Sequence, residues 1–335
     1  MNLKVIATGV LALVTVGAGA QNISGAGATF PNPIYSKWFS EYSQLHPNVK
    51  INYQPIGSGG GIRQVTEGTV DFGASDVTMT DQQIAAAKVK VIALPTVLGA
   101  VVPVYNLPGV SRDLNFSGDV IADIYLGKIS NWNDARIAKD NPGVSLPNHQ
   151  ILPVYRSDGS GTSFIFTDFL SKVSPAWNSG PGRGAAVNWP AGIGQKGNEG
   201  IAGMVRQSPF SFGYVELIYA VQNKMSYGLV KNSAGKFLKA STDGVTAAAA
   251  GAAKNMPPDY RISITNAPGA DAYPISSFTW LLIPTHSNDT AKTKALVDFL
   301  GWMLDHGEAE AAGLTYAPLP KTVQDMVRKS IATIK

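Results

Sequence analysis

The chain has 335 residues, of which 44% are hydrophobic and 15% charged, a balance typical of globular proteins and sufficient for two domains of about 100–200 residues each. The net charge is only +4 and no dense Lys/Arg run occurs, so a nucleic-acid partner is not indicated. Cysteine is absent, which excludes disulfides, Cys-based metal sites and lipid attachment at a Cys.

The N-terminal segment has the pattern of a secretory signal peptide. Lys4 gives a basic start, Val5–Val16 is a short apolar run, and Ala18-Gly19-Ala20 matches a small-x-small cleavage site. The apolar run is shorter than the ~20 residues of a membrane span. We therefore expect residues 1–20 to be removed after Ala20 and the mature protein to be exported, most simply to the periplasm.

The following residues alternate strand-like and helix-like stretches, which predicts an α/β fold with a largely parallel sheet. The expected elements as far as residue 83 are a strand from Ile23 that breaks at Gly25–Gly27, a helix starting near Pro31, a strand at 49–53, a turn at Ser58–Gly61, a helix that Gly68 ends, a strand at 70–75 and a capping box of Thr80 with Gln83.

Two long β-rich stretches, 91–104 and 273–284, have no helical period and are candidate crossovers between domains. The elements expected between and after them are a helix at 119–126, a strand at 151–155, helices from Phe166, Asn198 and Val215, a hairpin at 231–239, a helix at 242–253 and a helical tail from Thr290 with a break at 317–320.

Two crossovers predict a discontinuous first domain, residues 21–102 and 276–335, with an inserted second domain, residues 103–275. Clefts between domains are favoured ligand sites. We expect the domains to close about hinges near Val101–Val104 and Pro274–Phe278.

The segment Arg156–Phe164, RSDGSGTSF, holds the most informative chemistry. It offers one guanidinium, the hydroxyls of Ser160, Thr162 and Ser163, and two glycines, just ahead of an apolar helical run. Hydroxyls and free N–H groups at a helix start, with one fixed positive charge, predict a receptor for an oxyanion. No neighbouring residue in the sequence supplies a nucleophile's base or a metal, so the segment favours holding an anion over transforming one.

Three further turns share the pattern of a strand followed by Gly, Ser or Thr, and they carry Thr29, Ser58 and Asp76. Because ligands of open α/β sheets bind beyond the carboxyl ends of the strands, we expect these turns to meet the Arg156 segment. Thr29, Ser58, Ser160 and Thr162 would add hydroxyl donors, and Arg156 a planar fork of donors. Each residue taken alone is more often a turn, a helix cap or a surface ion pair.

Asp76 is an acceptor among donors, which is useful only if the ligand carries a proton. Phosphate does so at neutral pH and sulfate does not, and a site built for a ligand hydroxyl can reject its analogue by ~10⁴-fold or more. The pattern therefore predicts phosphate. Asp158, two residues after Arg156, is expected to orient the guanidinium.

At these residues the chain resembles the family of periplasmic phosphate-binding proteins of the high-affinity phosphate ABC transporter. The similar segments run in order from about residue 23 to the C-terminus and are GAGATFPNPIYSKW (25–38), NYQPIGSGGGIRQ (52–64), VDFGASD (70–76), DIYLGKISNW (123–132), RSDGSGTSF (156–164), QKGNEGIAG (195–203) and FGYVE (212–216).

The resemblance implies a two-domain periplasmic binding protein fold of type II, in which each α/β domain is a mixed, mostly parallel sheet flanked by helices. It implies a monomer that closes on one phosphate ion, HPO4 or H2PO4, and delivers it to an inner-membrane ABC permease for import. It places phosphate contacts on Thr29, Phe30 (N–H), Ser58, Asp76, Arg156, Ser160, Gly161 (N–H) and Thr162. The family often has a second Ser where this chain has Gly59, so we expect a more flexible turn there.

Two other functions remain open from the residues alone. A secreted phosphoester hydrolase would need a nucleophile with a base, or a metal pair. The four histidines, His46, His149, His286 and His306, lack metal-ligand spacing, so we expect no metal, no cofactor and no enzymatic activity. A surface adhesin reusing the fold is the third possibility.

Overall fold

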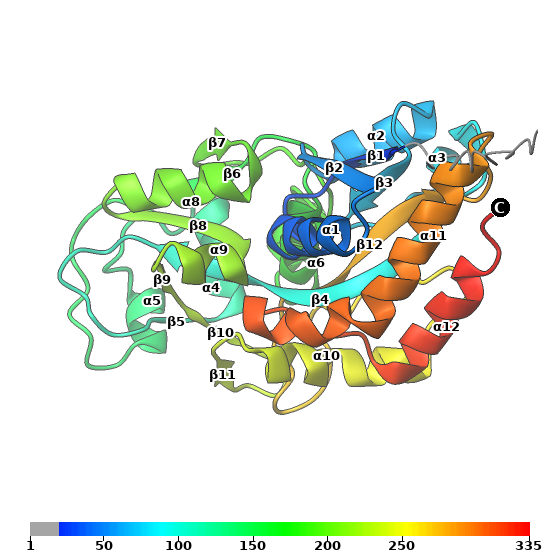
Figure 1. Cartoon of the computed structure of the whole chain (residues 1–335). Coiled ribbons are helices and arrows are strands. Elements are labelled where there is room, and N and C mark those ends of the chain that lie inside the picture. The colour runs from blue at the N-terminus through cyan, green and yellow to red at the C-terminus, as the bar shows by residue number, and fades with distance from the viewer. Residues whose placement is uncertain (1–19) are drawn as a thin grey trace, which may run out of the picture.

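The computed structural model describes residues 20–335 and consists of two lobes joined by two long strands (Figure 1). β4 (Val91–Tyr105) and β12 (Ser276–Pro284) pair antiparallel in the middle of a 9-stranded sheet of order β2-β1-β3-β12-β4-β8-β6-β7, in which β9 also pairs with β4. The expected signal peptide falls almost wholly on residues 1–19, outside the described residues.

The first lobe contains segments from both ends of the chain, seen as blue and orange-red ribbons on one side of Figure 1. Its strands pair in parallel and are β1 (Gln21–Gly27), β2 (Val49–Pro55) and β3 (Phe72–Ser75). Its helices are α1 (Asn32–Leu45), α2 (Ser58–Glu67), α3 (Asp81–Ala86), α11 (Thr290–Asp305), η1 (Gly307–Leu314) and α12 (Lys321–Ile331).

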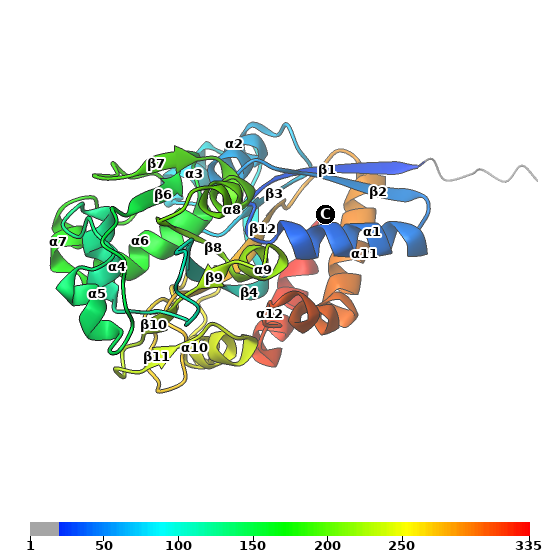
Figure 2. The same cartoon turned by 90° about the vertical axis from the view of Figure 1, so that its left-hand side faces the viewer.

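The second lobe is built from the middle of the chain, as the view in Figure 2 shows. Its strands β6 (Leu152–Arg156), β7 (Ile193–Gln195) and β8 (Ser211–Glu216) also pair in parallel. Its helices are α4 (Gly118–Tyr125), α5 (Ala135–Asp140), α6 (Gly161–Val173), α7 (Pro175–Ser179), α8 (Gly197–Gln207) and α9 (Leu217–Gln222).

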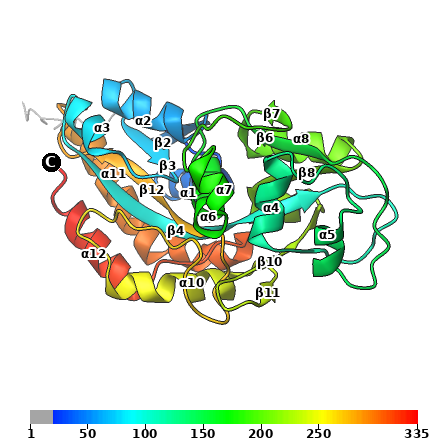
Figure 3. The same ribbon diagram turned by 180° about the vertical axis from the view of Figure 1, so that it is seen from behind.

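Beneath the strands that join the lobes lies a 3-stranded sheet of order β11-β10-β5 (Figure 3). The elements of this region are β5 (Asn115–Phe116), β9 (Ser226–Tyr227), β10 (Leu229–Lys231), β11 (Phe237–Leu238) and α10 (Thr242–Lys254). β10 and β11 form the expected hairpin.

β4 and β12 are buried along nearly their whole length, which explains their continuous apolar sequences. The antiparallel pairs of the large sheet all involve one of these two strands, whereas the other strands of each lobe pair in parallel. The expected two-domain α/β fold with mixed sheets flanked by helices is therefore confirmed. Within residues 20–335, no helix combines the length and apolarity needed to cross a membrane.

Some local predictions were confirmed and others were wrong. The capping box of Thr80 with Gln83 is present, and Gly68 ends α2 in the left-handed conformation. The strand that we expected to break at Gly25–Gly27 instead continues to Gly27. The helix that we expected from Val215 starts two residues later, at Leu217, so Val215 belongs to β8.

The turn expected at Ser58–Gly61 is instead the first turn of α2. The reason is tertiary packing. A Cβ on Gly61 would lie 2.5 Å from the Ala74 carbonyl oxygen and one on Gly27 only 2.0 Å from it. These glycines allow α2 to sit directly on the ends of β1 and β3, which fixes the position of Ser58.

Candidate functional site

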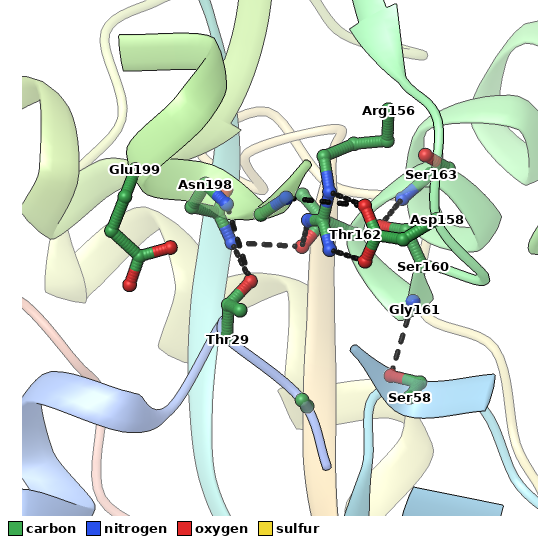
Figure 4. Close-up of polar contacts among 12 residues, drawn as sticks. Thr29, Ser58, Arg156, Asp158, Ser160, Gly161, Thr162, Ser163, Asn198 and Glu199 are labelled. Carbon is green, nitrogen blue, oxygen red and sulfur yellow. Dashed lines mark hydrogen bonds and ion pairs between the residues drawn. The ribbon is translucent and has the colours of Figure 1, made fainter. Parts of the chain in front are cut away.

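The predicted site residues meet where strands of both lobes end. Thr29 lies two residues after β1, Ser58 begins α2 after β2, Asp76 directly follows β3, and Arg156 is the last residue of β6. These side chains, with those of Phe30, Ser160 and Thr162, are no more than 3% exposed. The structure thus brings together all the positions that the sequence singled out, including Gly161, whose N–H donates to Ser58 Oγ across the lobes at 3.1 Å (Figure 4).

The N-terminus of α6 supplies backbone donors. Ser160 is the N-cap, and its Oγ accepts a hydrogen bond from the Ser163 N–H at 3.0 Å. The backbone N–H groups of Thr162 and Phe30 make no hydrogen bond to any residue of the described chain. The Thr162 N–H lies at the start of the 13-residue helix α6, whose dipole favours an anion at this point, and Phe30 lies two residues before the start of α1.

Arg156 is held by Asp158 in a two-point ion pair, so the expected contact between them is present. Arg156 Nε donates to Asp158 Oδ1 at 2.7 Å and Nη2 donates to Oδ2 at 2.5 Å. Asp158 also accepts the Gly197 N–H at 3.1 Å. Burial opposes ionisation of Asp158, but the hydrogen bonds and charge of Arg156, together with backbone N–H groups that include that of Gly197, outweigh burial and lower the pKa of Asp158.

The guanidinium keeps donors for a further ligand. It has five N–H groups. Two are engaged by Asp158, and one on Nη1 points to Thr162 Oγ1 at 3.3 Å. One donor on each Nη nitrogen therefore remains, which is the forked arrangement that matches two oxygens of a tetrahedral oxyanion.

Asp76 is buried at the centre of the site and is held by hydroxyls. Thr279 Oγ1 donates to its Oδ1 at 2.8 Å, and Ser58 Oγ lies 3.4 Å from its Oδ2. Burial raises the pKa of Asp76 to about 7, although these hydrogen bonds and the charge of Arg156 act in the opposite direction. Asp76 is thus poised between acceptor and donor near neutral pH.

The two lobes touch each other directly around the site. Gly59 N–H donates to the Gly159 carbonyl at 2.8 Å, and the Tyr219 hydroxyl donates to the Thr29 carbonyl at 2.6 Å. Gly59 therefore lies in a helix with a contact across the lobes, not in the free turn that we expected. A Cβ on Gly59 would lie 3.2 Å from the Gly159 Cα, so a side chain there would crowd this contact.

Two polar residues of the site were not predicted from the sequence. Thr279 lies inside β12, where it looks like any other buried strand residue, and its partner Asp76 is 203 residues away. Asn198 lies in the first turn of α8 and donates to Thr29 and Thr162. Its place at a helix start within QKGNEGIAG was a usable signal.

The described residues contain no metal centre. In residues 20–335, no group of three or more His, Cys, Asp or Glu side chains could hold a metal ion. The donor-rich set around Asp76 also lacks a histidine base beside a hydroxyl. Its chemistry is that of a buried receptor for an anion.

Comparisons with known proteins agree with this geometry. The model of the PBP superfamily domain matches residues 14–306. The phosphate-binding protein PstS of Xylella fastidiosa (strain Temecula1) is 46% identical over 299 residues, covering 89% of this chain and 81% of the relative. PstS of Pasteurella multocida is 45% identical over 305 residues, covering 91% and 88%.

A solved structure shares the fold at lower identity. The structure of a high-affinity periplasmic phosphate-binding protein (PfluDING), bound with phosphate, superposes with a TM-score of 0.73 at 20% identity, covering 92% of this chain and 94% of that one. The resemblance noted in the sequence is therefore confirmed, and the chain belongs to the PstS family of phosphate-binding proteins within the PBP superfamily.

Proposed function

We propose that the chain is an extracytoplasmic receptor that captures inorganic phosphate, as HPO4 or H2PO4, between its lobes and delivers it to an ABC permease for import. The observation that carries the proposal is one buried acceptor, Asp76, set among donors from both lobes. The relatives named as phosphate-binding proteins support it. The family consists of transport substrate-binding proteins, so no catalytic step is proposed.

The proposed ligand contacts divide by chemistry. Arg156 supplies the remaining fork of its guanidinium, and the N–H groups of Phe30, Gly161 and Thr162 supply backbone donors. The hydroxyls of Thr29, Ser58, Ser160 and Thr162 complete the donor set. Gly161 N–H now donates to Ser58 Oγ, so a ligand would share or take over that bond. Asp158 would hold the guanidinium without touching the ligand.

Asp76 is proposed to select phosphate over sulfate. As a carboxylate it accepts a hydrogen bond from a protonated phosphate oxygen, whereas a sulfate oxygen would present a second bare acceptor in a buried place. Unpaired buried acceptors are costly because no water compensates them. The burial of Asp76, 2% exposed, is what gives this repulsion its strength.

The larger arrangement supports the remaining proposals. We assign residues 21–102 and 276–335 to one domain and 103–275 to the other, with hinges near Val101–Val104 and Pro274–Phe278, because β4 and β12 carry the chain between the lobes. β1 begins at Gln21, directly after the proposed cleavage site, which supports export of a mature periplasmic chain. The partner would be the inner-membrane phosphate permease, and the receptor a monomer.

Calorimetry with phosphate and with sulfate tests the function. We expect the wild type to bind phosphate tightly and sulfate weakly. In Asp76→Asn we expect the affinities for the two anions to become similar. Asp71→Asn is the matched control, because Asp71 precedes the same strand β3 and accepts hydrogen bonds from Ser24 away from the site. Equal affinity of the wild type for both anions would overturn the role of Asp76.

A chromogenic phosphomonoester, with and without divalent metal, tests the competing hydrolase. Turnover that disappears in Ser160→Ala would favour the hydrolase over the receptor. Absence of phosphate binding in calorimetry, at any ligand concentration, would overturn the receptor itself.

A further inference from the structure

Asn198 lies between hydroxyls of the two lobes, as Figure 4 shows. Its Nδ2 donates to Thr29 Oγ1 in the first lobe at 2.8 Å and to Thr162 Oγ1 in the second lobe at 3.2 Å. Its backbone N–H adds a longer bond of 3.3 Å to Thr29 Oγ1. The side chain is fully buried, so no water competes for these bonds.

The orientation of the Asn198 side-chain amide is fixed by the hydrogen bond that its oxygen accepts. Asn198 Oδ1 accepts the Glu216 backbone N–H at 3.0 Å. A backbone N–H is only a donor, so the oxygen of the amide must face it and the NH2 group must face the hydroxyls. Glu216 ends β8, a strand of the second lobe, and this anchors the amide to that lobe.

This direction determines what the two hydroxyls can do. Thr29 Oγ1 accepts hydrogen bonds from the backbone N–H and from the Nδ2 of Asn198. Thr162 Oγ1 accepts from Asn198 Nδ2 and from Arg156 Nη1, the latter at 3.3 Å. A hydroxyl has two acceptor lone pairs and one hydrogen. With its lone pairs occupied by N–H donors, each hydroxyl must give its hydrogen to another acceptor, and an anion is the acceptor that suits both.

We propose that Asn198 is a positioning residue that turns the Thr29 and Thr162 hydroxyls into donors for the anion and ties the first lobe to the second when the site is occupied. The inference rests on the proposed phosphate function. Asn198 acts through the two threonines and does not itself contact the anion. Because its oxygen is anchored in the second lobe, its bonds to Thr29 form only when the lobes meet.

Two substitutions of Asn198, by Ala and by Asp, should lower phosphate affinity by different amounts. Asn198→Ala removes both Nδ2 bonds to the threonines, together with the bond that Oδ1 accepts from the Glu216 N–H. We expect phosphate affinity to fall about 10-fold to 100-fold, as for the loss of one or two hydrogen bonds in a charged site. Asn198→Asp replaces the donor by a carboxylate, which accepts from the threonine hydroxyls and turns their hydrogens away from the anion. We therefore expect Asn198→Asp to bind phosphate more weakly than Asn198→Ala.

Asn141→Ala is the matched control. Asn141 is 4% exposed, its Nδ2 donates to the carbonyls of Asn115 and Ile137 at 2.8 and 2.9 Å, and its Oδ1 accepts the Asn115 N–H at 2.8 Å. Like Asn198, it donates two side-chain hydrogen bonds and accepts one backbone N–H, but its donors bond to backbone carbonyls, at a place remote from the site in the second lobe. We expect a similar loss of thermal stability and unchanged phosphate affinity.

A double-mutant cycle separates positioning from simple structural support. Phosphate affinity is measured by calorimetry for Asn198→Ala in the wild-type, Thr29→Val and Thr162→Val backgrounds. If Asn198 acts through these hydroxyls, its effect shrinks at least several-fold where a hydroxyl is already gone. If Asn198→Ala proves unstable, Asn198→Ser, too short to reach both threonines, takes its place in the cycle.

The outcomes are distinct. Wild-type protein that binds no phosphate would overturn the proposed function, whatever Asn198 does. Wild-type affinity in Asn198→Ala, or an equal loss in all three backgrounds, would overturn the inference while leaving the receptor intact. A loss of affinity in Asn141→Ala as large as that in Asn198→Ala would also overturn it.

Discussion

The two halves of the site differ in how they are held. In the second lobe, Arg156 is fixed by Asp158 and by the Tyr214 hydroxyl, which accepts the Arg156 N–H at 3.1 Å, and Ser160 caps its own helix. In the first lobe, Thr29 and Ser58 find bonding partners across the lobe boundary, in Asn198 and Gly161. The cationic half of the site, Arg156 and the start of α6, is therefore assembled within the second lobe. The hydroxyl half, Thr29 and Ser58, is completed only when the lobes meet.

This difference assigns separate tasks to the halves. A preassembled cation and helix N-terminus capture an anion without reorganisation, which favours affinity. The first lobe adds neutral donors and Asp76, which decide whether the anion carries a proton. We expect changes in the second lobe to lower the affinity for all oxyanions, and changes in the first lobe to alter closure and the choice of anion.

Arg156→Lys should give the largest loss. Lysine keeps the charge, but it lacks the planar guanidinium, which binds Asp158 and still has two N–H donors free for the ligand. Loss of two hydrogen bonds to a charged ligand at ~1.5–3 kcal/mol each predicts roughly 10²–10⁴-fold weaker phosphate binding by calorimetry. Sulfate binding should fall in proportion.

Arg136→Lys is the control for that change. Arg136 pairs with Asp134 through Nε and Nη2 at 3.0 and 2.9 Å, a geometry like that of Arg156, but its side chain is 44% exposed and remote from the site. Its replacement should leave phosphate affinity unchanged. Near-wild-type affinity in Arg156→Lys would show that charge alone, without the fork, captures the anion.

Gly161→Ala should have the next largest effect because, although Gly161 belongs to the second lobe, its added Cβ would meet the first lobe and oppose closure. A Cβ on Gly161 would lie 2.4 Å from Ser58 Oγ and 2.6 Å from the Asp76 Cβ, both in the first lobe. Overpacking of this kind costs ~1–3 kcal/mol, so we expect roughly 5-fold to 150-fold weaker phosphate binding. Small-angle scattering should show less compaction with phosphate than in the wild type.

Gly203→Ala in α8 is the control, since no atom lies within 4 Å of its added Cβ and it should bind and compact normally. Full compaction of Gly161→Ala with phosphate would mean that the hydroxyl half does not depend on close approach of the lobes.

The same contrast explains which parts of the site the sequence predicted. Four predicted residues end a strand or lie within three residues after one, so local patterns were enough to bring them to one edge of the sheets: Thr29, Ser58, Asp76 and Arg156. Thr279 was missed because its contact with Asp76 depends on the antiparallel pairing of β12 with β3, a long-range relation with no local signal.

The glycines of α2 show the opposite error. Three consecutive glycines, 59–61, predict a turn from local propensity, because glycine disfavours a helix by ~1 kcal/mol per residue relative to alanine. Contacts that exist only in the folded chain override that preference, since Gly61 packs on the Ala74 carbonyl and Gly59 on Gly159. The strands that were predicted from local patterns were placed to within a few residues, whereas β7 and β8 were not predicted.

The smallest effect expected concerns pH and sulfate. Burial raises the pKa of Asp76 to about 7, so above that pH the carboxylate repels sulfate, and below it the protonated group donates a hydrogen bond to sulfate. Sulfate itself does not titrate in this range. We therefore expect sulfate affinity to rise about 10-fold from about pH 8 to about pH 6, following the protonated fraction of Asp76. Calorimetry with Asp76→Asn should show no such dependence.

Thr279→Val sharpens this test, because its hydroxyl donates to Asp76 Oδ1 and so stabilises the carboxylate. Losing a bond of ~1 kcal/mol raises the pKa, and the sulfate profile should move upward by roughly half to one pH unit. Thr285→Val, which removes a buried hydroxyl just past the end of β12 that donates to the Lys90 carbonyl, should leave the profile in place. A profile that moves downward in Thr279→Val would mean that the hydroxyl favours the protonated form of Asp76, and the selectivity of the first lobe would need another origin.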